Sequence, residues 1–241
     1  MMDRKQTNSA VELSVIMPVY NEAGLIGGVL EGWLSALDAL GIVFQLHVYD
    51  DGSRDGTGEV IARMSQSDGR IIAHHKANTG HGATILKGYR DNCTAQWLFQ
   101  TDSDGEISPA HFHTLWQQRQ DYDILLGKRT GRNVHPTRNA ITLASRGLAR
   151  VLFGSGIVDV NSPYRLMRST AFADCFYRLP EDIFAPNVAI SATACLKKLR
   201  ILEVPVDCTE RKKGTTATKK IVAGAVQSLF QLLRYRIGLL A

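Results

Sequence analysis

Acidic residues follow three short apolar stretches of the chain, at places where they could do chemistry. Glu22 follows the first stretch, Asp50 and Asp51 follow a second, and Asp102 and Asp104 follow a third. Neighbouring carboxylates repel one another and resist ionisation unless a cation or a hydrogen-bonded ligand compensates them. Asp102 and Asp104 can therefore supply oxygen ligands to one Mg²⁺ or Mn²⁺ ion, which would complete its shell with water and phosphate oxygens.

Turn and capping roles are the alternative for such residues, because Asp, Gly and Ser are common in loops. We assign a capping role to Asp55 and Thr57, since a small polar residue before a helix caps its N-terminus. The small-residue turn 78–83 enters a helix whose N-terminus could face an anion. No Walker lysine loop or GxGxxG string follows the first apolar stretch, which excludes the common ATPase and dinucleotide-binding classes.

Apolar periodicity predicts the elements that hold these residues. Stretches of strand length alternate with segments of helical period, which predicts a mainly parallel, buried sheet with ligands bound beyond the carboxyl ends of its strands. The expected strands are Leu13–Pro18, Val43–Tyr49, Arg70–His74, Gln96–Gln100 and Asp123–Leu126, and the expected helices are Ile26–Leu40, Thr57–Met64, Ala83–Asp91 and Pro109–Arg119.

The pattern is looser after residue 127. We expect a helix that ends at Leu152, short strands at Val158 and at Tyr164–Met167, a helix Asn187–Leu199 and a strand Ile201–Val206. An amphipathic helix is expected from Thr218 onward. No linker rich in Pro, Gly or Ser divides the chain, so we expect one domain.

Composition narrows the class of protein. The 241 residues are 44% hydrophobic and 21% charged, which excludes disordered and collagen-like chains. No stretch reaches the roughly 18 apolar residues that span a bilayer, and the N-terminus lacks the apolar core of a secretory signal. Four widely spaced cysteines without a CxxC pair argue against zinc and disulfides. We therefore expect a cytoplasmic protein.

Basic charge is concentrated at the C-terminal end. Residues 197–241 carry ten Lys and Arg against three acids, a net +7, whereas residues 1–196 carry eighteen against twenty, a net −2. Such a patch suits a nucleic acid, an anionic lipid or a pyrophosphate, and it is equally typical of a solvated helix face.

Four strings along the first half carry a family resemblance: VIMPVYNE from Val15, YDDGSRDGT from Tyr49, NTGHGA from Asn78 and TDSDGE from Thr101. In order and spacing they resemble the nucleotide-sugar-binding half of the family 2 glycosyltransferases, which have the GT-A fold. GKR at 127–129, DVNSPYRLMR at 159–168 and EVPVDCTERKKG at 203–214 are similar to strings of the polyprenyl-phosphate sugar transferases within that family.

This resemblance implies an α/β fold with a mainly parallel, Rossmann-like sheet, helices on both faces and a C-terminal amphipathic helix. It divides the single domain 1–241 into a nucleotide-sugar-binding half (12–130), an acceptor-binding half (131–217) and that helix (218–241).

It also implies roles for individual residues, with Mg²⁺ or Mn²⁺ as the cofactor. Asp104, Arg129 and Arg211 would act in catalysis, the arginines by contacting phosphates, and Asp102, Asp104 and Glu106 would surround the metal. The nucleotide sugar would contact Pro18, Tyr20, Glu22, Asp50, Asp51, Gly82, Asp102 and Ser103.

Three positions depart from the family pattern. Glu106 stands where the group usually has Gln and adds negative charge beside the metal. Pro163 replaces an expected Gly. Ala217 stands where a Lys is common, six residues after Arg211, so the acceptor-phosphate site has lost one expected cation unless Lys213, Lys219 or Lys220 substitutes.

Three functions remain open. The first is metal-dependent, inverting transfer of a sugar from a nucleoside diphosphate to a polyprenyl phosphate, and the second transfers it to a glycan hydroxyl in surface-polysaccharide assembly. A hydroxyl needs a general base, and the only candidates in the second half, Asp159, Glu181 and Asp182, lie in no catalytic string.

A non-catalytic nucleotide-binding or nucleic-acid-binding module is the third function. We rank it last, because the acidic residues would repel a polyphosphate without metal and aromatic residues interleaved with basic ones are scarce. We therefore expect a lipid-phosphate acceptor and no nucleic-acid partner. For residues 219–241 we expect core packing or a homodimer contact first, and peripheral membrane contact close behind.

Overall fold

Seven strands form one sheet in the computed structural model, which describes residues 11–130 and 157–209. The strand order is β3-β2-β1-β4-β6-β5-β7, and only β6 runs antiparallel to its neighbours. The strands are β1 (Leu13–Val19), β2 (Phe44–Asp50), β3 (Ile71–His75), β4 (Trp97–Gln100), β5 (Ile124–Thr130), β6 (Arg165–Arg168) and β7 (Ile201–Asp207). The prediction of a mainly parallel sheet is confirmed.

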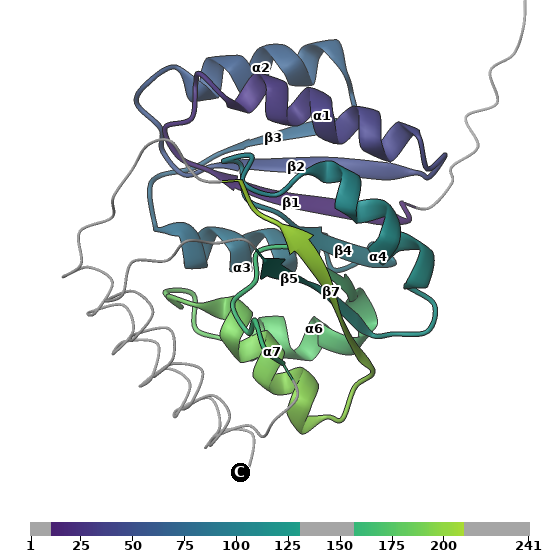
Figure 1. Cartoon of the computed structure of the whole chain (residues 1–241). Helices are drawn as coiled ribbons and strands as arrows, with labels where there is room; N and C mark the ends of the chain where they lie inside the picture. The colour runs from purple at the N-terminus through teal and green to yellow at the C-terminus, as the bar shows by residue number, and fades with distance from the viewer. Residues whose placement is uncertain (1–10, 131–156, 210–241) are drawn as a thin grey trace, which may run out of the picture.

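Helices cover both faces of the sheet (Figure 1). On one face lie α1 (Ile26–Asp38), α2 (Thr57–Ser67) and α4 (Phe112–Gln118), the last preceded by a 3₁₀ turn at Pro109–His111. On the other face lie α3 (His81–Asn92), α6 (Ser169–Arg178) and α7 (Pro186–Leu196). Because both faces of the sheet are buried, β1 is an almost continuous apolar run, and all seven of its residues are buried.

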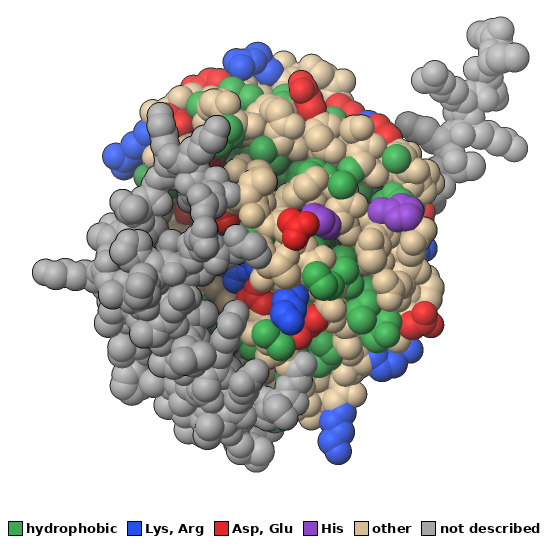
Figure 2. All heavy atoms as spheres, viewed as in Figure 1, with side chains coloured by type: hydrophobic (Ala, Val, Ile, Leu, Met, Phe, Trp, Pro, Cys, Tyr) green, Lys and Arg blue, Asp and Glu red, His purple; other side chains and the backbone are tan. Residues whose placement is uncertain are grey.

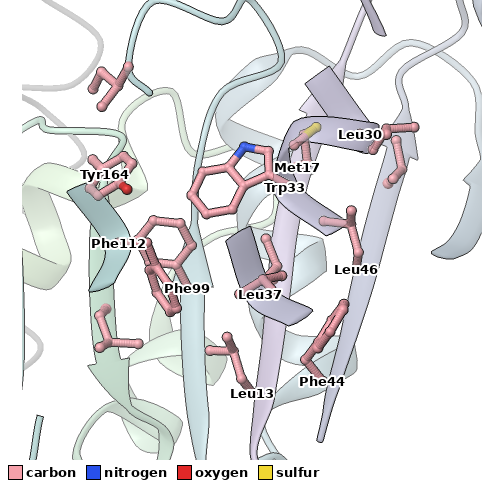
Figure 3. Close-up of a cluster of buried hydrophobic side chains, with 14 of the residues drawn as sticks. Leu13, Met17, Leu30, Trp33, Leu37, Phe44, Leu46, Phe99, Phe112 and Tyr164 are labelled. Atoms are coloured by element: carbon pink, nitrogen blue, oxygen red, sulfur yellow. The ribbon is translucent and has the colours of Figure 1, made fainter. Parts of the chain in front are cut away.

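Aromatic rings fill the core between the sheet and the first layer of helices (Figure 3). Phe99 of β4 lies at its centre, with its ring centroid 5.2 Å from that of Trp33 and 4.6 Å from that of Phe112. Tyr164 adds an edge-to-face contact to Phe99 at 4.8 Å. This packing fixes β4, the strand that leads into Asp102, against α1 and α4.

Two features of the second half differ from the sequence prediction. The predicted strand at Val158 is wrong: the backbone N–H groups of Val158 and Asp159 donate to the carboxylate of Glu203 instead of to a neighbouring strand. Helix α6 was not predicted, because it begins directly after β6 with no turn residues between them. The predicted helices ending at Leu152 and starting at Thr218 lie outside the described residues.

The sheet brings the sequence-predicted residues to one edge. β1, β2, β4 and β5 run in the same direction, so their carboxyl ends lie on the same side of the molecule. The pairing of β4 with β1 stops at the Ile16–Gln100 pair, two residues before Pro18. Pro18 can therefore occupy a central strand, because its missing N–H faces a side where no strand bond is needed.

Candidate active site

Asp102 lies just beyond β4 in a turn completed by Gly105, whose φ is +69°. Its side chain is 30% exposed, and its Oδ1 accepts a hydrogen bond from Nε2 of Gln100 at 3.1 Å and lies 3.6 Å from Nε2 of His81. Asp104 accepts a bond from the backbone N–H of Glu106 at 3.0 Å. Among the described residues, neither aspartate forms a salt bridge with a lysine, and the cationic partner of Asp102 is His81 when that ring is protonated.

The surroundings of Asp102 disfavour its ionised form. Removal from bulk water is the largest effect and raises the pKa of Asp102. The charges of His81 and Arg129 oppose this rise, whereas the charge of Asp104 adds to it. An ion bound between the two aspartates would remove their mutual repulsion, so the charge balance fits a divalent cation.

The donor set limits what kind of metal site this can be. Two carboxylates offer the hard oxygen ligands that Mg²⁺ and Mn²⁺ prefer. Within residues 11–130 and 157–209, no three His, Cys, Asp or Glu side chains are grouped so that they could hold an ion by themselves. The residues therefore fit an ion that takes its remaining ligands from a substrate and from water, and Glu106 stays a prediction as a ligand.

Arg129, near the end of β5, is held by a buried carboxylate. Its Nε and Nη2 donate to the two oxygens of Asp159 at 2.7 and 2.9 Å. Burial alone would lower the pKa of Arg129, but the hydrogen bonds and charge of Asp159 raise it. These bonds use two of the five guanidinium N–H groups, so within the part of the chain that the structure describes Arg129 has further donors that could bind an anion. Arg211 lies outside the described residues.

Asp51, which follows β2, is bound by its own loop. Its carboxylate forms a salt bridge with Lys76 and accepts the backbone N–H groups of Thr79 and Gly80, both at 2.9 Å. Burial would raise the pKa of Asp51, but the bonds from Lys76 and Thr79 lower it below its ordinary value. Asp51 thus fixes the segment that leads into α3, and its contact with a nucleotide stays a prediction.

Asp50 also serves local structure. It is 6% exposed, accepts the backbone N–H of Ser53 at 3.0 Å and contacts Nδ1 of His75 at 3.3 Å.

The segment after β1 is joined to the segment after β2. The backbone N–H of Asn21, a residue with φ +54°, donates to Ser53, and the backbone N–H of Glu22 donates to Thr57, each at 2.9 Å. Tyr20 beside them is 47% exposed, as a side chain that stacks on a ligand would be. The N-cap of α2 is Gly56, and not the predicted Asp55 or Thr57. Asp55 instead accepts hydrogen bonds from the backbone N–H and the hydroxyl of Thr57, the first residue of the helix.

Gly82 and Ser103 are both buried. A Cβ on Gly82 would lie 2.2 Å from the carbonyl oxygen of Phe184 and 2.4 Å from that of Ile183. Gly82 therefore lets the segment before α7 pack against the start of α3, and a contact with the nucleotide sugar stays a prediction for both residues.

Sequence reasoning missed a set of buried polar residues that are linked by hydrogen bonds to Asp102. Gln100, Tyr89 and Arg165 are each 0% exposed, and Asn187 is 4% exposed. Gln100 ends an otherwise apolar strand, and a polar residue in that position is the one signal that could have revealed the set.

Solved structures with the same fold are glycosyltransferases. Mannosyl-3-phosphoglycerate synthase from Rubrobacter xylanophilus matches with a TM-score of 0.68 and 13% identity over 93% of this chain and 73% of its own. Glucosyl-3-phosphoglycerate synthase from Mycobacterium tuberculosis, solved with Mn²⁺, UDP-glucose and phosphoglyceric acid, also gives 0.68, with 16% identity over 94% of this chain and 80% of its own. The predicted GT-A fold is confirmed.

Sequence comparison gives the family. Residues 14–176 match the pattern described as glycosyl transferase family 2, and the chain belongs to that family. The prediction of a nucleotide-sugar-dependent glycosyltransferase is thereby confirmed at the level of the family.

Relatives with assigned names lie within the predicted group of polyprenyl-phosphate sugar transferases. Undecaprenyl-phosphate mannosyltransferase of Micrococcus luteus is 25% identical over 93% of this chain and 98% of its own length. Undecaprenyl-phosphate 4-deoxy-4-formamido-L-arabinose transferase of Edwardsiella ictaluri is 26% identical over 84% of this chain, which spans 61% of that relative's length. The predicted resemblance to this group is confirmed.

Proposed function

We propose that the chain transfers a sugar from a nucleoside diphosphate sugar to a polyprenyl phosphate, with inversion at the anomeric carbon. The observation that carries the proposal is that Asp102 and Asp104 lie at the same sheet edge as Arg129, whose guanidinium uses two of its five N–H groups on Asp159 among the described residues. The near end-to-end match to a mannosyltransferase named for undecaprenyl phosphate supports the choice of acceptor.

Asp102 and Asp104 would hold Mg²⁺ or Mn²⁺, which neutralises the charge that develops on the departing diphosphate. Arg129 would donate its remaining N–H groups to a phosphate, and a guanidinium suits this role because its planar fork can bind two oxygens. Asp159 would keep that fork aligned, since it fixes Nε and Nη2 from behind. The acceptor phosphate oxygen would attack the anomeric carbon as the bond to the nucleoside diphosphate breaks.

The phosphate acceptor is preferred because a hydroxyl acceptor would need a base. Asp159 is paired with Arg129, and the 93% exposed side chain of Glu181 lies 3.6 Å from Arg90. A lipid phosphate is already anionic and needs only orientation and charge neutralisation. Transfer to a glycan hydroxyl remains the second outcome of the test below.

We expect the reaction to take place at a membrane surface, because the acceptor would be a lipid. No helix in the described ranges 11–130 and 157–209 is long and apolar enough to cross a bilayer. Because the proposed acceptor is a lipid phosphate, we propose peripheral contact at the cytoplasmic face of the membrane. The predicted contribution of residues 219–241 lies outside the described residues, and a homodimer stays a prediction.

Acceptor and donor can be tested together. Labelled UDP-, GDP- and dTDP-sugars are offered with Mn²⁺ and either a polyprenyl phosphate or a soluble glycan, and label is measured in the organic and aqueous phases. The proposal predicts label in the organic phase that needs both polyprenyl phosphate and metal. Label confined to the glycan would contradict the acceptor, and metal-independent transfer would contradict the role of Asp102 and Asp104.

A further inference from the structure

Three buried side chains from distant parts of the chain form a line of hydrogen bonds that ends on Asp102. The hydroxyl of Tyr89 in α3 donates to Oδ1 of Asn187 in α7 at 3.1 Å. Nδ2 of Asn187 donates to Oε1 of Gln100 at 2.8 Å. Nε2 of Gln100 then donates to Oδ1 of Asp102 at 3.1 Å.

When Asp102 is ionised, as it must be to bind a cation, the chemistry of the groups allows only one direction for this line. A carboxylate can only accept, so Gln100 must turn its NH₂ toward Asp102. The carbonyl of Gln100 is then an acceptor, which requires the NH₂ of Asn187, and the carbonyl of Asn187 in turn requires the hydroxyl proton of Tyr89. Burial raises the pKa of Tyr89, so that proton stays in place.

The buried side chain of Arg165 fixes the position of Asn187 at the start of α7. The guanidinium of Arg165, 0% exposed, donates from Nη1 to the backbone carbonyl of Asn187 at 3.0 Å and from Nε and Nη2 to that of Ser162 at 2.9 and 2.7 Å. Burial lowers the pKa of Arg165 to about 10, which still leaves it charged near neutrality. The amide of Asn187 is thus fixed by its backbone as well as by its two side-chain partners.

We propose that Asn187 is a positioning residue, which acts through Gln100 to orient the carboxylate of Asp102 for the divalent cation. This inference rests on the proposed function, since it concerns the same metal site. It makes α7, in the half expected to bind the acceptor, a structural support of the donor site. A carboxylate held by a directed donor is more selective in orientation than one that rotates freely, and losing such partners of a metal ligand typically weakens metal binding.

The test compares near-isosteric, apolar replacements by Mn²⁺ binding, measured by electron paramagnetic resonance with UDP and, in parallel, GDP present. Gln100→Met should raise the Mn²⁺ dissociation constant about 10-fold, and Asn187→Leu should raise it by a smaller factor in the same direction. The double variant should bind Mn²⁺ no worse than Gln100→Met alone, because Asn187 acts only through Gln100. At saturating Mn²⁺ the kcat of Asn187→Leu should return toward that of the wild type.

Ser191→Ala is the matched control. Ser191 lies one turn further along α7, is 1% exposed and donates to the carbonyl of Val160 at 2.8 Å, so this variant also removes a buried hydrogen bond from the helix. Its Mn²⁺ dissociation constant should equal that of the wild type. If Asn187→Leu does not fold, Tyr89→Phe interrupts the same line at its far end and should shift Mn²⁺ binding in the same direction.

Two results would contradict the proposal that Asn187 positions Asp102 through Gln100. One is equal Mn²⁺ binding by Asn187→Leu and Ser191→Ala. The other is a double variant whose loss of Mn²⁺ affinity is the product of the losses in Gln100→Met and Asn187→Leu. A wild-type chain that binds no Mn²⁺ with either nucleotide would instead contradict the proposed function, and with it the positioning role of Asn187.

Discussion

At the scale of single residues, the pair of Arg129 and Asp159 has both a structural and a chemical role. The side chains are 19% and 6% exposed, so the ion pair joins two charges that are largely removed from water. Removing one partner of a buried ion pair is destabilising, whereas replacing both with apolar side chains need not be costly. Stability and transfer can therefore be separated by mutation.

Arg129→Met should lower the free energy of unfolding by roughly 3–5 kcal/mol, because it removes two hydrogen bonds and an opposite charge from the buried carboxylate of Asp159. The double variant Arg129→Met/Asp159→Leu should recover much of that stability but little of the transfer activity. Urea denaturation and the transfer assay measure the two effects. Full activity in the stable double variant would show that Arg129 serves only the fold.

His47, on β2, makes stability depend on acidity. Burial, and then the nearby charge of His74, lower the pKa of His47 to about 4, and Asp91 only partly opposes them. Nε2 of His47 is buried without a hydrogen-bond partner among the described residues. The folded protein therefore keeps His47 neutral at acidities where the unfolded chain, with an ordinary pKa of 6.5, binds a proton.

The stabilising effect of neutral His47 is complete above the unfolded pKa and is lost as the pH falls toward the folded one. Between pH 7 and pH 5 this amounts to about 2 kcal/mol of the free energy of unfolding. Denaturant unfolding at the two pH values measures it, and His47→Phe should reduce the difference. An unchanged pH dependence in that variant would place the titrating group elsewhere.

The sequence placed Asp102 and Asp104 at a strand end because they follow an apolar stretch, and Arg129 was identified through the family resemblance of the string at 127–129. It could not predict the partners of these residues. Asp159 is 30 residues from Arg129, and Asn187 is 87 residues from Gln100, so both contacts arise only when the chain folds. Asp51 shows that a conspicuous sequence motif can also serve local structure. Its carboxylate accepts the backbone N–H groups of Thr79 and Gly80 and so holds a loop.

At the scale of elements, the close contact between α3 and the segment before α7 depends on a glycine. Gly82→Ala should lower the free energy of unfolding by roughly 1–3 kcal/mol, because its Cβ would overlap the carbonyl oxygens of Ile183 and Phe184. Gly28→Ala in α1 is the control, since nothing lies within 4 Å of its Cβ position. That variant should be more stable by up to about 1 kcal/mol. Equal thermal unfolding of both variants would contradict the contact.

The strands and helices of the first half were predictable because short apolar stretches alternate with segments of helical period and turn residues separate them. The second half lacks such boundaries: α6 follows β6 without a break, and Glu203 replaces strand pairing at Val158 with side-chain bonds. Periodicity describes which face of an element is apolar, and it does not reveal when a side chain substitutes for a strand.

At the scale of the whole molecule, charge is divided unevenly along the chain. The described residues contain 15 Lys and Arg against 21 acids, a net −6, and the other residues contain 13 against 2, a net +11, which together give the +5 of the chain. Figure 2 shows acidic and basic side chains of the described residues interspersed on the face in view. The net positive charge of the chain therefore comes from residues outside the described ranges.

Deletion of residues 219–241 tests whether the basic C-terminal end contributes to membrane contact. If it does, flotation with anionic liposomes should recover less of the shortened chain than of the full chain, and added salt should reduce the recovery of the full chain. Circular dichroism checks that the shortened chain is folded. Equal flotation of the two chains would reject the membrane role of this segment.

The central claim is that Asp102 and Asp104 bind a nucleoside diphosphate through a divalent ion. Calorimetric titration of the chain with UDP and with GDP, each with Mn²⁺ and with a chelator, measures this directly, with Asp104→Asn as the variant. The account predicts that the wild type binds one of the nucleotides more tightly with Mn²⁺ and that Asp104→Asn loses most of this gain. Equal affinity with and without the metal in the wild type, or an undiminished metal effect in Asp104→Asn, would contradict it.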